Sequence, residues 1–278
     1  MENLNGQVDV QFLQTDPLPQ VAVTVNGHRA RLLLDTGAPG LDLSEGFAAT
    51  AGVTATAVGK GVFAGGRSAQ IRMGGKIDAL GIGTITAHDV PAGVSPVGPN
   101  VDGVLGMNFL DHFLATIDYV HGRLILRPKS ASDAFERTAA AAGDTIVPMY
   151  LVPDHQIFVR ARVNDAPEAL FNVDTGGGPR VGVELTKASL AAAHIVPDAA
   201  GAFSFMGGGG EVQVEPFVAS AVSLGSTTIK NVPGMYVPES GSDPGPPFAV
   251  AGRISHAFFR HTELSFDFSA MKLIVSSR

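Results

Sequence analysis

The chain has 278 residues, 45% of them hydrophobic and only 16% charged, which is a globular composition with enough apolar residues for one large domain or two lobes. The net charge of −7 argues against nucleic acid, which binds basic surfaces, and no apolar run approaches the roughly 18 residues that span a bilayer. The absence of cysteine excludes disulfides, thiolate catalysis and cysteine–metal sites.

Composition also indicates the class of secondary structure. The chain has 34 glycines and 18 prolines, and its Val/Ile/Thr-rich segments are short, which predicts many short strands joined by tight turns. Residues 1–20 contain neither the basic nor the apolar segment of a signal peptide. The missing cysteines do not fix the compartment, and we expect a periplasmic or secreted protein whose signal peptide has been removed.

The first predicted elements lead to an acidic turn. Residues 20–25 alternate toward Asn26-Gly27, a strong hairpin signal. The returning strand ends in three leucines that run into Asp35-Thr36-Gly37. Ser44 is a suitable N-cap for a short helix over 45–51.

A glycine-rich hairpin follows at 62–67 and leads into a strand over 68–73. We then expect a turn at Leu80-Gly81, a Val-Pro pair at 90–91, an apolar pair before glycine at 104–106 and a closing hairpin over 116–126.

Residues 127–143 form the seam between the halves. We predict a helix over 131–142, with Asp133 and Glu136 spaced as a capping box and Gly143 as its C-cap. The predicted organisation is therefore an N-terminal lobe (1–130), a linker helix (131–143) and a C-terminal lobe (144–278). Residues 7–13, residues 145–151 and the C-terminal strand are expected to pair as a platform under both lobes.

The second half repeats the landmarks of the first. Asp174-Thr175-Gly176 lies 139 residues after Asp35-Thr36-Gly37, which is half the length of the chain. The other repeated landmarks are a strand over 158–163 with the turn Asn164-Asp165, Thr186 as N-cap of a helix over 187–194, a glycine-rich hairpin at 205–210, a strand over 211–215, Leu224-Gly225, Val232-Pro233 and a closing hairpin over 263–275.

The halves differ after the Val-Pro pair. Residues 240–247 (SGSDPGPP) read as a loop without regular structure, in place of 97–102 of the first half. We align Val250-Ala251-Gly252 with 104–106, which puts Arg253 in the place of Met107. This apolar-apolar-glycine match is weak.

The repeated acidic turn suggests a catalytic pair. If the halves pack about a pseudo-two-fold axis, Asp35 and Asp174 meet at that axis. Two carboxylates a few Å apart cannot both ionise, so they share one proton. The ionised member can deprotonate water, while the protonated member polarises an amide carbonyl. One Asp-Thr-Gly is most often an ordinary turn, but two copies with matching flanks make that interpretation improbable.

Other chemistries find little support in the sequence. His256 and His261 are spaced wrongly for one helical face, and no His-Glu-x-x-His motif occurs. The glycines at 207–210 lack the context of a phosphate-binding loop. Asp118 and Asp267, in the closing hairpins, are interpreted as structural. We expect no metal and no cofactor.

These motifs resemble the aspartic proteases, in particular the retropepsin-like branch, duplicated in tandem as in pepsin-like enzymes. The matches are Leu-Leu-Asp-Thr-Gly-Ala at 33–38, Asn-Val-Asp-Thr-Gly-Gly at 172–177 and the run at 102–110. The resemblance implies a mainly β, two-lobed acid-protease β-barrel fold with pseudo-two-fold symmetry. It implies that Asp35 and Asp174 are the catalytic residues. It implies that the catalytic loops are supported by Thr36, Gly37, Thr175 and Gly176. It places the substrate-binding flaps at Phe63, Gly65, Gly66, Met206, Gly207 and Gly208.

The chain departs from pepsins at two kinds of position. Pepsins usually have Ser or Thr after the catalytic glycine, where Ala38 and Gly177 stand here. The loss of that hydrogen bond to the ionised carboxylate is expected to raise a pKa and to move the pH optimum to mild acid. The flaps also lack the usual tyrosine, although Phe63 can cover the site.

We therefore expect a monomeric aspartic endopeptidase that binds an extended peptide or protein substrate along its flaps, with apolar subsites near Phe63, Phe203, Phe205 and Met206. No nucleic acid partner and no membrane span are expected. The alternative is a catalytically weak or inactive peptide-binding protein on the same fold.

Overall fold

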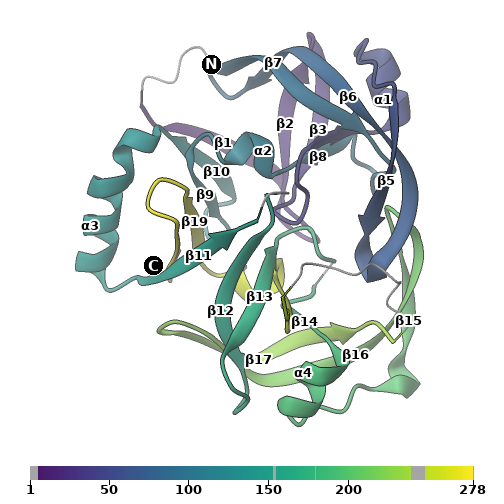
Figure 1. Ribbon diagram of the computed structural model, residues 1–278. Coiled ribbons are helices and arrows are strands. Elements are labelled where there is room, and N and C mark those ends of the chain that lie inside the picture. The colour runs from purple at the N-terminus through teal and green to yellow at the C-terminus, as the bar shows by residue number, and fades with distance from the viewer. Residues whose placement is uncertain (1–5, 153–154, 179, 239–247, 278) are drawn as a thin grey trace.

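The structure, a computed structural model, describes residues 6–152, 155–178, 180–238 and 248–277. It confirms a mainly β fold with a few short helices (Figure 1). The alternating sequences form the strands as expected: Val21, Val23 and Val25 are buried, while the residues between them face solvent. No helix of the described residues is long and apolar enough to cross a bilayer.

The first half contributes ten strands and two short helices in its described part. They are β1 (Val8–Gln14), β2 (Gln20–Val25), β3 (His28–Leu34), β4 (Leu41–Leu43), α1 (Glu45–Thr50), β5 (Ala57–Phe63), β6 (Arg67–Ile82), β7 (Ile85–Val94), β8 (Gly103–Leu105), α2 (Met107–Leu110), β9 (Leu114–Asp118) and β10 (Arg123–Arg127), with a 3-10 turn at Ala64–Gly66.

The second half follows a 3-10 turn (Lys129–Ala131) and α3 (Ser132–Ala142), and it has the same order of elements. They are β11 (Thr145–Leu151), β12 (Ile157–Val163), β13 (Ala169–Asp174), β14 (Val183–Leu185), α4 (Lys187–Ala192), β15 (Phe203–Gly207), β16 (Gly210–Leu224), β17 (Thr227–Tyr236), β18 (Gly252–Ser255), α5 (His256–Phe259), β19 (Glu263–Asp267) and β20 (Lys272–Ser276), with a 3-10 turn at Ala199–Gly201.

The strand pairings of the two halves are the same. Each pairing within the first half recurs between the strands numbered ten higher: β2 pairs with β3 and β6, and β12 pairs with β13 and β16. β3 lies parallel to β8, as β13 does to β18. The duplication seen in the sequence is therefore a duplication of topology, with one lobe above the other in Figure 1.

A repeated asparagine shows how closely the lobes correspond. Asn26 has φ 50°, donates its side-chain amide to Ala51 O and accepts from Ala79 N. Asn164 also has φ 50° and makes the equivalent bonds to Ala193 and Ala221. Asparagine tolerates this left-handed turn and ties it to the helix end and to the long strand.

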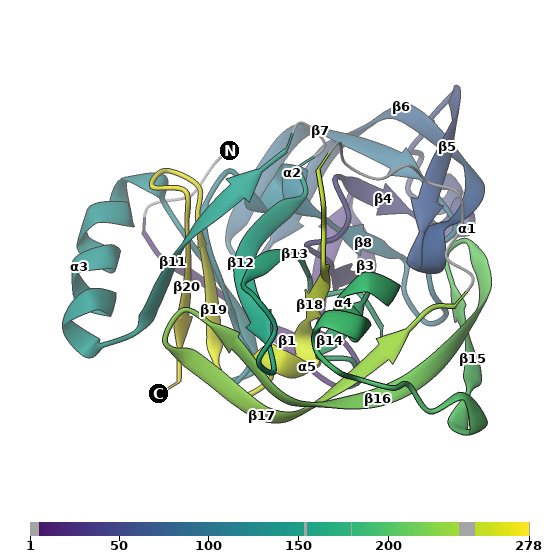
Figure 2. The ribbon, with the colours of Figure 1, turned by 60° about the horizontal axis from the view of Figure 1, so that its bottom comes forward.

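The lobes share a sheet of six antiparallel strands in the order β1-β10-β9-β19-β20-β11. This sheet contains the three segments of the predicted platform, but only β11 and the C-terminal strand β20 pair with each other; β1 lies at the opposite edge and pairs with β10. β9 and β19 pair at the centre of the sheet, where Thr116 and Ser265 are register partners joined by a 2.7 Å hydroxyl–hydroxyl hydrogen bond. The pseudo-two-fold axis passes between these two residues, and Figure 2 shows β19 and β20 alongside β11 in this layer.

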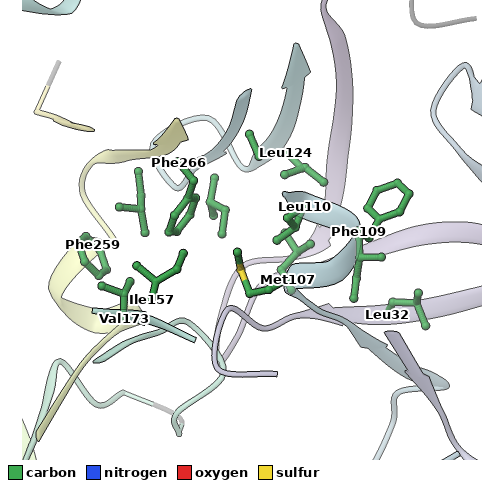
Figure 3. Close-up of a cluster of buried hydrophobic side chains, with 14 of the residues drawn as sticks. Leu32, Met107, Phe109, Leu110, Leu124, Ile157, Val173, Phe259 and Phe266 are labelled. Atoms are coloured by element: carbon green, nitrogen blue, oxygen red, sulfur yellow. The ribbon is translucent and has the colours of Figure 1, made fainter. Parts of the chain in front are cut away.

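One apolar core runs through both lobes. In Figure 3, Met107 of the first half lies next to Ile157 of the second, and both are fully buried. Burial of a large aliphatic side chain stabilises the fold by about 1.5–3 kcal/mol, so this shared core holds the halves together.

The linker helix begins differently from the prediction. The capping box is wrong, because α3 starts at Ser132 after a 3-10 turn and its N-cap, Ala131, makes no side-chain bond. Glu136 instead pairs with Lys272 of β20. Gly143 does end the helix in the left-handed conformation, with φ 77°. The lobe limits remain a prediction.

Two predicted landmarks were out of register. β6 continues through Leu80-Gly81, and the chain turns at Gly83 instead, because Gly81 pairs with Thr86 inside the sheet. β18 starts at Gly252, so Gly252 is the counterpart of Gly103 and not of Gly106. The loop predicted at 240–247 lies outside the described residues.

Candidate active site

The two acidic turns stand at the carboxyl ends of β3 and β13. Each strand is held between an antiparallel neighbour and a parallel one, so its end is fixed on both sides. Asp35 follows Leu34 and donates its backbone amide to Leu105 O at 3.2 Å, while the backbone carbonyl of Asp174 accepts from Ser255 Oγ at 2.7 Å. These contacts fix the two carboxyl-bearing residues before any substrate binds.

The two loops are cross-linked by their threonines, as the sequence predicts. Thr36 Oγ1 donates to Val173 O at 2.8 Å and accepts from Thr175 N at 3.1 Å. Thr175 Oγ1 donates to Leu34 O at 3.0 Å and accepts from Thr36 N at 3.1 Å. Both threonines are fully buried. Four hydrogen bonds therefore lock one lobe's acidic loop to the other's.

The glycines after the threonines make room for the opposite carboxyl group. A Cβ on Gly37 would lie 2.5 Å from Asp174 Cγ, and one on Gly176 would lie 2.2 Å from Asp35 Cγ. Each glycine also donates its amide to the aspartate of its own loop, at 2.8 Å to Asp35 Oδ1 and 3.0 Å to Asp174 Oδ1. Any larger residue at Gly37 or Gly176 would displace a carboxyl group.

The two carboxyl groups are close enough to share a hydrogen bond and to repel one another. Burial, and after it the charge of Asp174, raises the pKa of Asp35 from 3.8 to about 8. Because two carboxyl groups this close do not both ionise readily, the pair holds one shared proton near neutral pH. One carboxylate and one carboxylic acid face each other, which is the state needed for paired base and acid catalysis.

Three further residues border the pair, and the sequence assigned them no role in a site. Arg253 Nε lies 3.8 Å from Asp174 Oδ2, and Arg253 Nη1 lies 3.3 Å from Glu184 Oε2. Tyr119 is buried close enough to both aspartates for their charges to help raise its pKa, and its hydroxyl has no hydrogen-bond partner among the described residues. The sequence did contain a signal for Arg253. Asp118 and Asp267 are equivalent residues of the two closing hairpins and are 149 residues apart, and the same offset makes Arg253 the counterpart of Val104.

The predicted flaps occupy equivalent places and contact each other. Gly65, at the tip of the β5–β6 hairpin, lies against the second lobe, where a Cβ would be 2.8 Å from Val212. Gly208, at the tip of the β15–β16 hairpin, lies against Phe63, where a Cβ would be 2.5 Å from the ring.

The remaining flap residues differ in exposure. Gly66 has φ 66° in the first tip, and Gly207 pairs with Gly210 next to the second. Met206 and Phe203 are exposed, while Phe205 packs against a small second core of Val181, Val212, Val214, Met235 and Val237. Ala64 of the first flap packs against the same core, so the hairpins bridge the lobes.

Three possible metal ligands come together elsewhere among the described residues, at Asp118, His121 and Glu263. Asp118 is already satisfied there: it accepts from Arg123 Nε at 2.9 Å and from His121 N at 2.9 Å. The guanidinium supplies the positive charge that a cation would bring, so we interpret this cluster as an ion-pair network of the central sheet. Asp267, its counterpart, accepts from Ser132 Oγ.

The chain is similar to one family model and to solved structures. Residues 21–109 match the family model described as aspartyl protease. Basic 7S globulin from soybean shares the fold at a TM-score of 0.57 and 12% identity, over 98% of this chain and 95% of that one. A retropepsin-like aspartic protease from Rickettsia conorii matches at 20% identity with a TM-score of 0.33, over 44% of this chain and 88% of that one. Comparison with curated proteins found no match.

Proposed function

We propose that this chain, a member of the aspartic protease family by its first lobe and by its fold, is an aspartic endopeptidase. The observation that supports this most is the proton-sharing pair of Asp35 and Asp174, which come from different lobes and are locked together by the threonine bonds. The pair needs neither metal nor nucleophilic side chain to activate water.

The proposed reaction uses both protonation states of the pair. The ionised carboxylate takes a proton from water as the water oxygen bonds to the peptide carbonyl carbon, and the protonated carboxyl gives its proton to the carbonyl oxygen. The product is a neutral tetrahedral diol. Transfer of a proton to the amide nitrogen then lets the carbon–nitrogen bond break, giving a carboxyl group and an amine.

The substrate is proposed to be an extended peptide held between the pair and the flaps. Flap strands offer backbone amides and carbonyls along the peptide, while exposed Phe203 and Met206 offer apolar contacts. Because the flap tips contact each other across the lobes, they must separate for a chain to enter.

That same contact favours a second candidate, a peptide-binding protein that turns over slowly or not at all. A peptide library separates the two functions when it is incubated with wild type, Asp35→Asn and the matched surface variant Asp78→Asn, whose carboxyl is largely exposed. If the protein is an endopeptidase, wild type and Asp78→Asn cleave the peptides and Asp35→Asn does not. Retention of peptides without cleavage from pH 3 to 8 supports the binding protein.

A further inference from the structure

The lobes differ in charge at the strand beside the catalytic pair. Val104 of β8 is the register partner of Leu33, and Arg253 of β18 is the register partner of Asn172. An arginine therefore stands in the second lobe where the first lobe has valine. The pseudo-symmetry of the site is broken by one cation.

The cation is held in place from the neighbouring strand. Glu184 of β14 pairs in register with Arg253 and accepts from its Nη1 at 3.3 Å. The equivalent first-lobe carboxyl, Asp42, pairs in register with Val104 and interacts with Ser95 and the Gly93 amide instead. Glu184 thus anchors the guanidinium with its Nε 3.8 Å from Asp174 Oδ2.

The other contacts to the two carboxyl groups are nearly symmetric, although the Asp174 backbone also accepts from Ser255 Oγ, where the first lobe has Gly106. Each aspartate accepts one backbone amide at similar length, from Gly37 and Gly176. Tyr119 stays neutral, because its pKa is raised mainly by burial and further by the charges of the two aspartates. Glu184, negative itself, is paired with the guanidinium. The charge of Arg253 lowers the pKa of Asp35 as well, but of the two aspartates, both among the described residues, only Asp174 lies within ion-pair distance of its guanidinium. Arg253 is therefore the group that distinguishes the two carboxyl groups.

We propose that Arg253 is a positioning residue that fixes the negative charge of the pair on Asp174 and leaves the shared proton on Asp35. A positive charge next to one carboxylate favours its ionised form, typically by one to three pKa units.

The catalytic roles that this asymmetry gives to the two aspartates rest on the proposed function. In the hydrolysis described above, Asp174 becomes the base that takes the proton of water, and Asp35 becomes the acid that protonates the carbonyl oxygen. The location of the proton itself does not depend on turnover, so it can be tested in the resting protein.

The test is a carboxyl-carbon NMR titration of the protein labelled at aspartate, with Asp35→Asn and Asp174→Asn used to assign the two signals. In wild type we expect Asp174 to be ionised and Asp35 protonated at pH 6. In Arg253→Gln the two signals should move toward each other, and the lower titration should rise by roughly one pH unit. Arg253→Lys keeps the charge and should retain most of the asymmetry.

Two controls isolate the charge. Glu184→Gln/Arg253→Gln removes both partners, so its shift cannot come from an unpaired Glu184. Arg72→Gln breaks the exposed Arg72–Glu45 pair, which has the same chemistry at 3.0 Å, and should leave both titrations unchanged. Urea unfolding of every variant confirms that it is folded.

The outcomes separate the two proposals. If Asp35 ionises before Asp174 in wild type, or if folded Arg253→Gln titrates as wild type, the inference about Arg253 is overturned whatever the activity. If the asymmetry is present and no peptide is cleaved, the inference stands and the proposed function fails. If cleavage occurs, the acid limb of its pH profile should move upward in Arg253→Gln by the shift that NMR measures.

Discussion

Replacement of Thr36 by valine tests whether the cross-linked loops hold the site together. Valine has nearly the same shape but no hydroxyl, so Val173 O and Thr175 N each lose a hydrogen bond, at 2.8 and 3.1 Å, in a fully buried place. A buried group left without its partner costs about 1–3 kcal/mol. Two such groups give an expected loss of about 3 kcal/mol in the free energy of unfolding.

The assay is urea unfolding followed by circular dichroism at pH 6. The matched control is Thr138→Val, an exposed threonine whose hydroxyl bonds to Ala134 O at 2.9 Å within α3. Surface changes of this kind stay within about 0.5 kcal/mol. If Thr36→Val is no less stable than Thr138→Val, the threonine bonds do not stabilise the junction of the lobes and this reasoning is refuted.

Three other changes give independent checks. Gly37→Ala should lower cleavage at least about 100-fold, because its Cβ displaces the Asp174 carboxyl, while Gly46→Ala, which meets open space, should not. Burial lowers the His256 pKa from 6.5 to about 4, so stability that is present above pH 6.5 is lost as pH falls toward 4. Between pH 6.5 and pH 4.5, urea unfolding should therefore show that wild type loses about 2 kcal/mol more unfolding free energy than His256→Met does. Asn26→Ala and Asn164→Ala should each cost about 2 kcal/mol of unfolding free energy, equal within about 0.5, because each loses the same two bonds; unequal losses contradict the equivalence of the lobes.

The central motif was predictable because its signal is local. Asp-Thr-Gly after an apolar run specifies a strand that ends in an acidic turn, and its repetition predicts two such turns that meet. The helix starts at Ser44 and Thr186 were also predictable, because one hydroxyl accepting from the third amide of the helix defines each cap. Both caps are present.

What the sequence did not reveal depends on strand register. Arg253 was aligned with Met107 because Gly252 was taken as the counterpart of Gly106. The pairing of β18 with β13 instead makes Gly252 the counterpart of Gly103, three residues earlier. In that register His256 replaces Met107, and Ser255 replaces Gly106 and bonds to the Asp174 backbone. Long-range pairing, not residue type, decides which side chain reaches the pair.

The central claim is that one aspartate from each lobe forms a single proton-sharing catalytic pair. The most direct test is the rate of peptide-library cleavage by wild type, Asp35→Asn and Asp174→Asn across pH 4 to 9. The account predicts cleavage by wild type that falls as pH rises through about 8, when Asp35 loses its proton, and a loss of about 1,000-fold or more in each variant. Cleavage that persists in either variant would contradict it.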